Sequence, residues 1–184
     1  LLSLHTKGSA ASPAGVLAVI SGGGTTRLFL VDGGTLKLKD LILQSGQTTA
    51  SGAAIFAQNG AKLVFLSTVI IQKCMSAEYG AGVVLQGSHT TLSLGGADTH
   101  VIIQDNVGTQ GGGGLLVSGG ANVVVSGGAL LAVRNNTATK LHGGGIFLEI
   151  GARLAVSSVG TKVTISNNSA GQAGGGLFAQ LQAS

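Results

Sequence analysis

The side chains that could do acid–base chemistry or bind a cation are few and widely spaced. Six of the 184 residues are acidic: Asp32, Asp40, Glu78, Asp98, Asp105 and Glu149. The two closest, Asp98 and Asp105, are seven residues apart, and no D-x-D pair occurs. General acid–base catalysis and calcium binding both need carboxylates that are held close together. The acidic residues therefore predict no catalytic pair, and Asp98 with Asp105 is the pair nearest to forming one.

The histidines, the single cysteine and the glycine-rich runs also lack the spacing of a known site. His5, His89, His100 and His142 share no metal-ligand spacing. Cys74 has no partner for an internal disulfide, and we expect it to be a small buried apolar residue. No glycine run matches the phosphate-binding pattern G-x-x-x-x-G-K-[ST]. We therefore predict no catalytic residue, no metal site and no cofactor.

Two asparagines have the spacing of a modification site. Asn135 begins the triplet Asn-Asn-Thr, and Asn167 begins the triplet Asn-Asn-Ser. Both triplets fit the N-x-[ST] pattern of N-glycosylation. Asn135 and Asn167 are therefore candidate attachment sites for glycans in a secreted chain.

The composition excludes several classes of protein. Hydrophobic residues make up 44% of the chain, which indicates a folded core rather than a disordered linker. Charged residues are only 9%, the net charge is +4, and there is no Trp. The basic residues are scattered and aromatics are scarce, so we predict no nucleic-acid partner. No apolar run reaches the roughly 18 residues of a membrane span, so we predict no transmembrane segment.

Short apolar segments recur along the chain with a period of about 30 residues. One series reads Ile55-Phe56, Val84-Leu85, Leu115-Leu116, Ile146-Phe147 and Leu177-Phe178, with steps of 29 or 31 residues. A second reads LILQSG (41–46), VIIQKC (69–74), VIIQDN (101–106), LAVRNN (131–136) and VTISNN (163–168). A third reads TLKLK (35–39), KLVFL (62–66), TLSL (91–94), NVVV (122–125) and RLAV (153–156). Each repeat thus holds three short segments with the composition of β-strands.

This pattern predicts an all-β fold, a right-handed parallel β-helix. A repeat of three short strands cannot bury its own apolar side, whereas stacked repeats can. We expect about 5–6 coils of roughly 30 residues, three short strands per coil, in one domain that spans residues 1–184. Residues 1–20 would form an N-terminal coil or cap, and residues 21–184 the repeats. We also expect the chain to be a fragment of a longer one.

Strand alternation predicts which apolar residues face the core. The first inward row is Leu36, Leu63, Leu92, Val123 and Leu154, and the second is Leu38, Phe65, Leu94, Val125 and Val156. The third is Leu41, Val69, Val101, Leu131 and Val163, and the fourth is Leu43, Ile71, Ile103, Val133 and Ile165.

The asparagines and the glycines are predicted to form the corners of the coil. Asn106, Asn136 and Asn168 fall at one corner, where Asn tolerates the left-handed conformation of a sharp bend. Their amides can also hydrogen-bond to one another along a ladder of coils. The glycine clusters mark the next corner, where backbones approach closely.

One apolar row is predicted to face outward. Both residues of each pair in the first series are apolar, yet alternation lets only one of them face the core. The candidate interface stripe is the second set: Phe56, Leu85, Leu116, Phe147 and Phe178. Because an aligned apolar row is rarely left in water, we expect it to pack against loops, a sister protofilament or another subunit.

The corner motifs resemble those of a known class of repeats. I-S-N-N-S-A (165–170) with G-G-G-L-F (174–178), and V-R-N-N-T-A (133–138) with G-G-G-I-F (143–147), resemble the paired FxxN and GGA[ILV] repeats of polymorphic outer membrane proteins. The segment 21–46 is similar to the first coils of pectate-lyase-like, right-handed β-helix proteins. The resemblance implies an exported surface protein that works by display, adhesion or assembly.

We therefore expect a non-catalytic structural or display module of an extracellular or cell-surface protein. It would be a stiff rod, a filament or sheath subunit, or the stalk of an adhesin. Its partners would be further copies of itself or other surface or fibre subunits, with glycans as a further possibility. The alternative is a carbohydrate-binding or polysaccharide-degrading β-helix protein whose site lies mostly outside this piece. An ice-binding surface is disfavoured because no flat ladder of threonines at i, i+2 is present.

Overall fold

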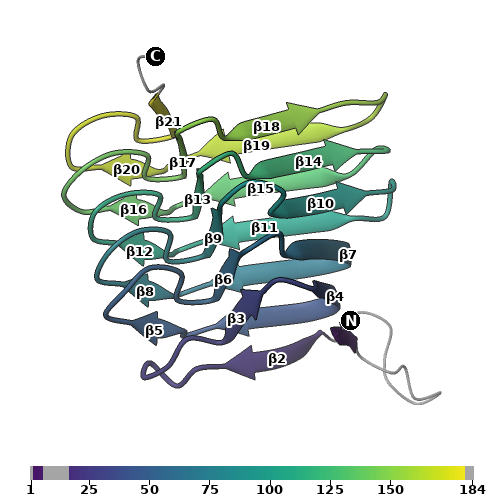
Figure 1. Cartoon of the computed structure of the whole chain (residues 1–184), viewed down its shortest axis with the longest axis horizontal. Coiled ribbons are helices and arrows are strands. Elements are labelled where there is room, and N and C mark those ends of the chain that lie inside the picture. Colours follow the sequence, from purple (N-terminus) through teal and green to yellow (C-terminus); the bar gives the residue numbers. More distant parts are fainter. Residues whose placement is uncertain (1, 6–16, 181–184) are drawn as a thin grey trace.

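The chain is a stack of parallel β-strand coils. The computed structural model describes residues 2–5 and 17–180, and within these ranges every regular element is a strand. About five turns, roughly 31 residues apart, lie one above another, with the N-terminal strands at one end of the stack and the C-terminal strands at the other (Figure 1). The predicted parallel β-helix is confirmed.

Each turn passes through three sheets that run along the stack. The six-stranded sheet contains β3 (Phe29–Asp32), β6 (Ile55–Gln58), β9 (Val83–Gln86), β13 (Leu115–Ser118), β17 (Ile146–Glu149) and β21 (Leu177–Gln180). The five-stranded sheet contains β5 (Gln47–Thr48), β8 (Met75–Ser76), β12 (Val107–Gly108), β16 (Thr137–Ala138) and β20 (Ser169–Ala170). These two-residue strands were not predicted, since two residues are too few to show alternation.

The ten-stranded sheet is bent into two halves. Its two long strands are β4 (Thr35–Gln44) and β7 (Lys62–Gln72), which bend at Asp40 and Ser67, each with φ of 53°. On the first half stack β10 (Thr91–Gly95), β14 (Asn122–Ser126) and β18 (Arg153–Val156). On the second half stack β11 (His100–Gln104), β15 (Leu130–Arg134) and β19 (Lys162–Ser166). In these later coils a short turn replaces the bend, so one long strand becomes two.

The N-terminal strands extend the same sheet beneath β4. Both β1 (Leu2–His5) and β2 (Ala18–Ser21) pair with β4 in parallel, β1 with its first half and β2 with its second. Part of the predicted N-terminal coil or cap, residues 1 and 6–16, lies outside the described residues. We call the five complete turns coils 1 to 5, beginning at β3, β6, β9, β13 and β17.

The core is built from the four inward rows that strand alternation predicts. Leu36, Leu63, Leu92, Val123 and Leu154 stand in register on successive strands, and so do the members of the other three rows. In coils 1 to 4 all of these side chains are buried. Because each is covered by its counterparts above and below, every row forms a continuous rod of packed apolar groups. Among the described residues no helix has the length and hydropathy of a membrane-spanning helix.

Candidate functional site: the asparagine ladder and the outer apolar column

One corner of the solenoid carries a column of five residues, Gly46, Cys74, Asn106, Asn136 and Asn168, on successive coils. In every coil the residue just before this column has a left-handed backbone: Ser45, Lys73, Asp105, Asn135 and Asn167 have φ between 53° and 55°. The prediction that Asn106, Asn136 and Asn168 adopt this conformation was therefore wrong by one residue. Each N-N pair contains two asparagines that could adopt the left-handed conformation, and the first of the two, Asn135 or Asn167, adopts it.

The column asparagines form a hydrogen-bonded ladder instead. The Asn106 amide nitrogen donates to Asn136 Oδ1 at 3.0 Å, and the Asn136 amide nitrogen donates to Asn168 Oδ1 at 3.0 Å. The same two oxygens accept the backbone N–H groups of Asn106 and Asn136, at 3.1 and 2.8 Å. Asn106 and Asn136 are fully buried. A buried amide without these partners would be costly, so the ladder fixes the vertical spacing of the coils at this corner.

Cys74 continues the ladder in weaker form. Its backbone N–H donates to Asn106 Oδ1 at 3.0 Å, and its thiol accepts the Gly46 N–H at 3.4 Å. Burial raises the pKa of the Cys74 thiol to about 11, against a small opposing effect of the Gly46 N–H. The thiol is therefore neutral at physiological pH, when a nucleophile or metal ligand would need to be a thiolate. The predicted reading of Cys74 as a small buried side chain agrees with this geometry.

The glycine that precedes each later strand of the six-stranded sheet makes room for the asparagine ladder of the next coil. A Cβ at Gly114 would lie 2.9 Å from Asn136 Nδ2 and 2.7 Å from the Gly145 carbonyl oxygen. A Cβ at Gly145 would lie 2.7 Å from Asn168 Nδ2. The N-N and G-G-G motifs therefore recur together because each asparagine amide occupies space that a side chain on the neighbouring glycine would fill.

A second apolar cluster lies outside the main core. Val84, Leu116 and Phe147 are buried in it, with 1%, 6% and 3% of their surface exposed, and Phe56, Tyr79 and Phe178 pack against them. We call the row Phe56, Val84, Leu116, Phe147 and Phe178 the outer column. Its members are paired in register on β6, β9, β13, β17 and β21.

The outer column corrects one residue of the predicted interface stripe. Leu85 does not belong to it: Ile55 pairs with Val83 and Val83 with Leu115, so Val84 occupies the row and Leu85 faces the core, fully buried. Phe56, Leu116, Phe147 and Phe178 do share one row, as predicted. The middle of this row is covered by the chain's own arch between the short strands and the six-stranded sheet, which is the first of the predicted alternatives, packing against loops.

Aromatic rings close the column across two coils. The Tyr79 ring centroid lies 6.3 Å from that of Phe147, which lies 5.4 Å edge-on from that of Phe178. The His142 ring stacks on Phe178 with 4.2 Å between centroids. Gly111 stands between Tyr79 and His142 in the arch, where an added Cβ would lie 3.0 Å from the Phe147 ring and 3.3 Å from the Tyr79 ring. The missing side chain at Gly111 therefore lets these rings meet.

The N-terminal end of the outer column is closed by Arg27. Its guanidinium lies over the Phe56 ring, 5.2 Å from the centroid. Its Nε and Nη2 donate to the carbonyl oxygens of Gly52 and Ser51 at 2.9 and 2.8 Å. Because the Arg27 guanidinium covers the Phe56 ring and already donates to two carbonyl oxygens, its role here is structural rather than that of an open binding group.

Several acidic side chains are engaged in contacts between coils. Asp32 Oδ1 accepts from Asn59 Nδ2 at 2.6 Å, and Glu78 Oε2 accepts from Ser51 Oγ at 3.0 Å. Asp40 Oδ1 accepts the Thr68 N–H at 3.4 Å. Asp98 is exposed, and Asp105 provides a left-handed bend. Within the described residues no group of three His, Cys, Asp or Glu side chains could hold a metal ion.

The sequon asparagines lie on the surface. Asn135 and Asn167 are exposed at equivalent bends of coils 4 and 5. The hydroxyls of their triplets, Thr137 Oγ1 and Ser169 Oγ, are 3.1 Å apart. The two candidate glycan sites are therefore direct neighbours along the stack.

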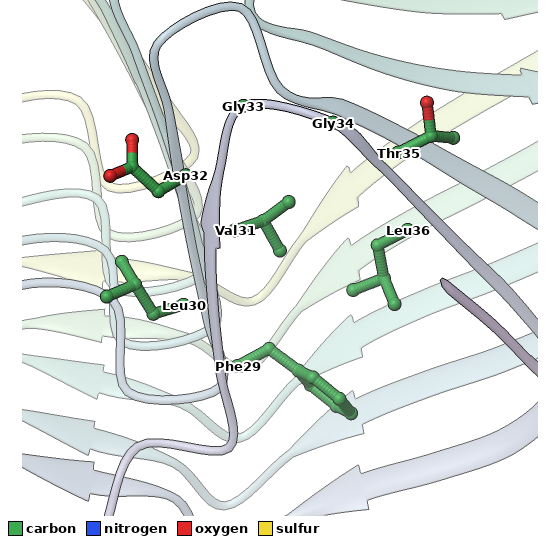
Figure 2. Close-up of a pocket in the computed structure, with 8 residues that line it drawn as sticks. All are labelled: Phe29, Leu30, Val31, Asp32, Gly33, Gly34, Thr35 and Leu36. Carbon is green, nitrogen blue, oxygen red and sulfur yellow. The ribbon is translucent and has the colours of Figure 1, made fainter. Parts of the chain in front are cut away.

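A cavity of about 340 Å³ opens at the N-terminal end of the core, between β3 and β4. Figure 2 shows Phe29, Val31 and Leu36 pointing to one side and Leu30 and Asp32 to the other. The turn Gly33–Gly34 borders it. The cavity is lined by residues 29–36, which include the apolar side chains of Phe29, Val31 and Leu36. No sequence pattern predicted this cavity.

Comparisons with known proteins identify no relative. No family model matches the chain, and no significant match is found among curated proteins or solved structures.

Proposed function

We propose that this chain is a non-catalytic structural or display module of an extracellular or cell-surface protein: a stiff rod, a filament or sheath subunit, or a stalk. The observation that carries the proposal is how its polar side chains are used. Asn106 and Asn136, both fully buried, bind only groups of their own and the adjacent coils. Hydrogen bonds that fix the distance between successive coils suit a protein that bears load or acts as a spacer, because they connect each coil to the next.

A second ladder on the outer surface supports the same proposal. Gln72 donates to Gln44 at 3.1 Å, Gln104 to Gln72 at 2.9 Å, and Arg134 Nε to Gln104 at 2.9 Å. These side chains project from the second half of the ten-stranded sheet. A solenoid braced by polar ladders on the inside and the outside of one corner resists bending there.

We further propose that the repeats are of the pectate-lyase-like, right-handed type and related to the FxxN and GGA[ILV] repeats of polymorphic outer membrane proteins. The support is the residues that carry the resemblance. In coils 4 and 5 each N-N bend is followed by a glycine arch that leads into an apolar pair. Because the repeats that it resembles belong to exported surface proteins, we also propose that this chain is exported and exposed at the surface.

Immunogold electron microscopy of intact source cells tests the function. Antibodies raised against the folded chain should label the cell surface or extracellular fibres, and protease treatment of intact cells should remove the label. Label that appears only after permeabilisation, at an intracellular site, would contradict the proposal. A second readout is glycosylation: in a eukaryotic source, peptide N-glycosidase should lower the mass of the native chain, and Asn135→Gln with Asn167→Gln should abolish that shift.

A further inference from the structure

The turn between β6 and β7 contains the one Asn-Gly sequence of the chain, Asn59-Gly60. Asn59 and Gly60 have φ of 55° and 75°, and the Ala61 N–H donates to the Gln58 carbonyl oxygen at 3.1 Å. These are the features of a type I′ turn, for which Asn-Gly is a favoured sequence. Asn59 is exposed to solvent.

An asparagine followed by glycine can lose its side-chain amide without an enzyme. The Gly60 nitrogen loses its proton to hydroxide and attacks Asn59 Cγ, so that an N–Cγ bond forms. The Cγ–Nδ2 bond breaks, and the leaving nitrogen takes a proton from water and departs as ammonia. Water then opens the five-membered imide ring at one of its two carbonyl carbons. Aspartate forms if the new N–Cγ bond breaks, and isoaspartate forms if the backbone C–N bond breaks.

The attacking nitrogen is held by the next coil. The Gly60 N–H donates to Thr90 Oγ1 at 3.1 Å, and Thr90 is fully buried. The Thr90 hydroxyl donates in turn to the Gln86 carbonyl oxygen at 2.9 Å, which fixes its position. The next two coils have alanine, Ala121 and Ala152, at the position equivalent to Thr90. Because the Gly60 N–H must leave its acceptor before the nitrogen can attack, the reaction requires a local opening of this turn.

The leaving amide is held by the preceding coil. Asn59 Nδ2 donates to Oδ1 of Asp32, an exposed side chain of β3 that points away from Phe29, Val31 and Leu36 (Figure 2). In the aspartate product, a carboxylate oxygen takes the place of this amide nitrogen. Two carboxylates at hydrogen-bond distance repel each other. Deamidation therefore replaces an attraction between coils 1 and 2 with a repulsion.

The other asparagines are less suited to the same reaction. Asn135 and Asn167 are exposed, but each is followed by asparagine, whose side chain obstructs the attack where glycine does not. Asn106 and Asn136 are fully buried in the ladder. Asn59 is therefore the position at which sequence and exposure both favour deamidation.

We propose that Asn59 is a site of spontaneous deamidation, that the Thr90 hydroxyl slows the reaction, and that the product weakens the contact between coils 1 and 2. The reactants are the protein itself and water. The inference goes beyond the proposed function and is independent of it, since it concerns the chemical lifetime of the stack rather than its location or partner.

Mass spectrometry of the folded protein after prolonged incubation in mildly alkaline buffer tests the site. The tryptic peptide 40–62 contains Asn59 as its only asparagine. Folded wild type should convert Asn59 before Asn135 or Asn167, but several-fold more slowly than wild type unfolded in urea. Thr90→Ala should convert it several-fold faster than folded wild type, because the acceptor of the Gly60 N–H is gone. Thr90→Ser is the matched control that keeps the hydroxyl, and its rate should stay close to that of wild type.

An Asn59 that stays unmodified in folded Thr90→Ala would overturn the site. Equal rates in folded wild type and folded Thr90→Ala would overturn the role of Thr90, and so would equal rates in folded and urea-unfolded wild type. Circular dichroism verifies that each variant is folded. If Thr90→Ala is unfolded, Thr90→Val takes its place, because valine keeps the shape of threonine without the hydroxyl.

Urea unfolding of Asn59→Asp, which reproduces the aspartate product, tests the consequence. At low salt Asn59→Asp should unfold at a lower urea concentration than the neutral control Asn59→Ser. The difference should shrink as salt is added, because the repulsion between exposed charges is screened. Asp32→Asn should abolish it, since one of the two carboxylates is then removed. Equal unfolding midpoints of Asn59→Asp and Asn59→Ser at low salt would contradict the repulsion between coils 1 and 2.

Discussion

The last strand of each sheet and the strand before it contain the same kinds of residue in the same places, yet they bury them very differently. Val125 on β14 is fully buried, and Val156, its counterpart on β18, is 49% exposed. In the outer column Phe147 on β17 is 3% exposed, whereas Phe178 on β21 is only partly buried. Burial in this fold is thus a property of the stack rather than of the residue. A given side chain stabilises the protein to the extent that another coil covers it.

The largest difference between these regions should appear in the outer column. Phe147→Ala should lower the free energy of unfolding by about 3–4 kcal/mol, because it opens a cavity among Leu116, Tyr79 and Phe178. Phe178→Ala should cost about 1 kcal/mol, since that ring is already partly in water. Urea unfolding followed by circular dichroism measures both. Equal losses at the two positions would contradict the dependence on neighbouring coils.

The asparagine ladder should show the same contrast on a smaller scale. Asn136→Ala leaves the buried amide of Asn106 without its acceptor and should cost about 3 kcal/mol. Asn168→Ala removes the acceptor of the buried Asn136 amide and should cost less, about 1–2 kcal/mol, because water can enter the space left by the partly exposed Asn168 side chain and reach that amide. The comparison is again made by denaturant unfolding. A cost at Asn168 as large as that at Asn136 would show that the end of the ladder is as closed as its middle.

The pH dependence of the unfolding free energy tests the burial of Cys74 in coil 2. Its thiol pKa rises from 9.0 to about 11 on folding, so the folded state favours the protonated form. The stabilisation is complete below about pH 9 and is lost as pH rises through 11, with a total of about 3 kcal/mol. Unfolding free energies measured across this range should fall more steeply for wild type than for Cys74→Ala. Parallel pH profiles of the two proteins would rule out the shift.

The smallest effect is expected at Ile150, at the open end. This β-branched residue has φ of 46° and 46% of its surface exposed, where the equivalent residues of other coils are Gly33, Asn59, Gly87 and Gly119. Ile150→Asn should stabilise the protein by roughly 0.5–1 kcal/mol, because Asn tolerates this conformation better. Val159→Asn is the matched control: Val159 is 99% exposed and is not among the residues with positive φ, so it should change little. A destabilised Ile150→Asn would point to a contact made by the isoleucine.

The sequence predicted the inner core better than the outer column, for a physical reason. The four inward rows follow from alternation, because polar or small residues separate the apolar ones in at least one repeat of each series, as in TLKLK (35–39) and VTIS (163–166). The repeat spacing then carries the same alternation to uninterrupted segments such as VII (69–71). The segment Val83-Val84-Leu85 has no such separation, so its alternation is ambiguous, and a coil-to-coil spacing of 28 and then 32 residues shifted the row by one. The asparagine column was predicted, but the left-handed residue next to it was not.

Packing of the outer column against loops was one of the predicted alternatives, but the choice among them could not be made from the sequence. It depends on the path of the arch that carries Tyr79 and His142, and on the space left by Gly111. Neither property shows as a periodic signal. Likewise, the cavity at β3 and the exposed rows of coil 5 depend on whether another coil covers them. The sequence of a single segment does not contain that information.

Hydrogen exchange measured by mass spectrometry on the folded chain tests the central claim most directly. If neighbouring coils supply the stability, amides of β14 should exchange far more slowly than those of β18, although the two strands are paired and similar in sequence pattern. Protection should decline from the middle coils toward β19 and β21. Equal protection of β14 and β18, or faster exchange in the middle coils than at the end, would contradict the account.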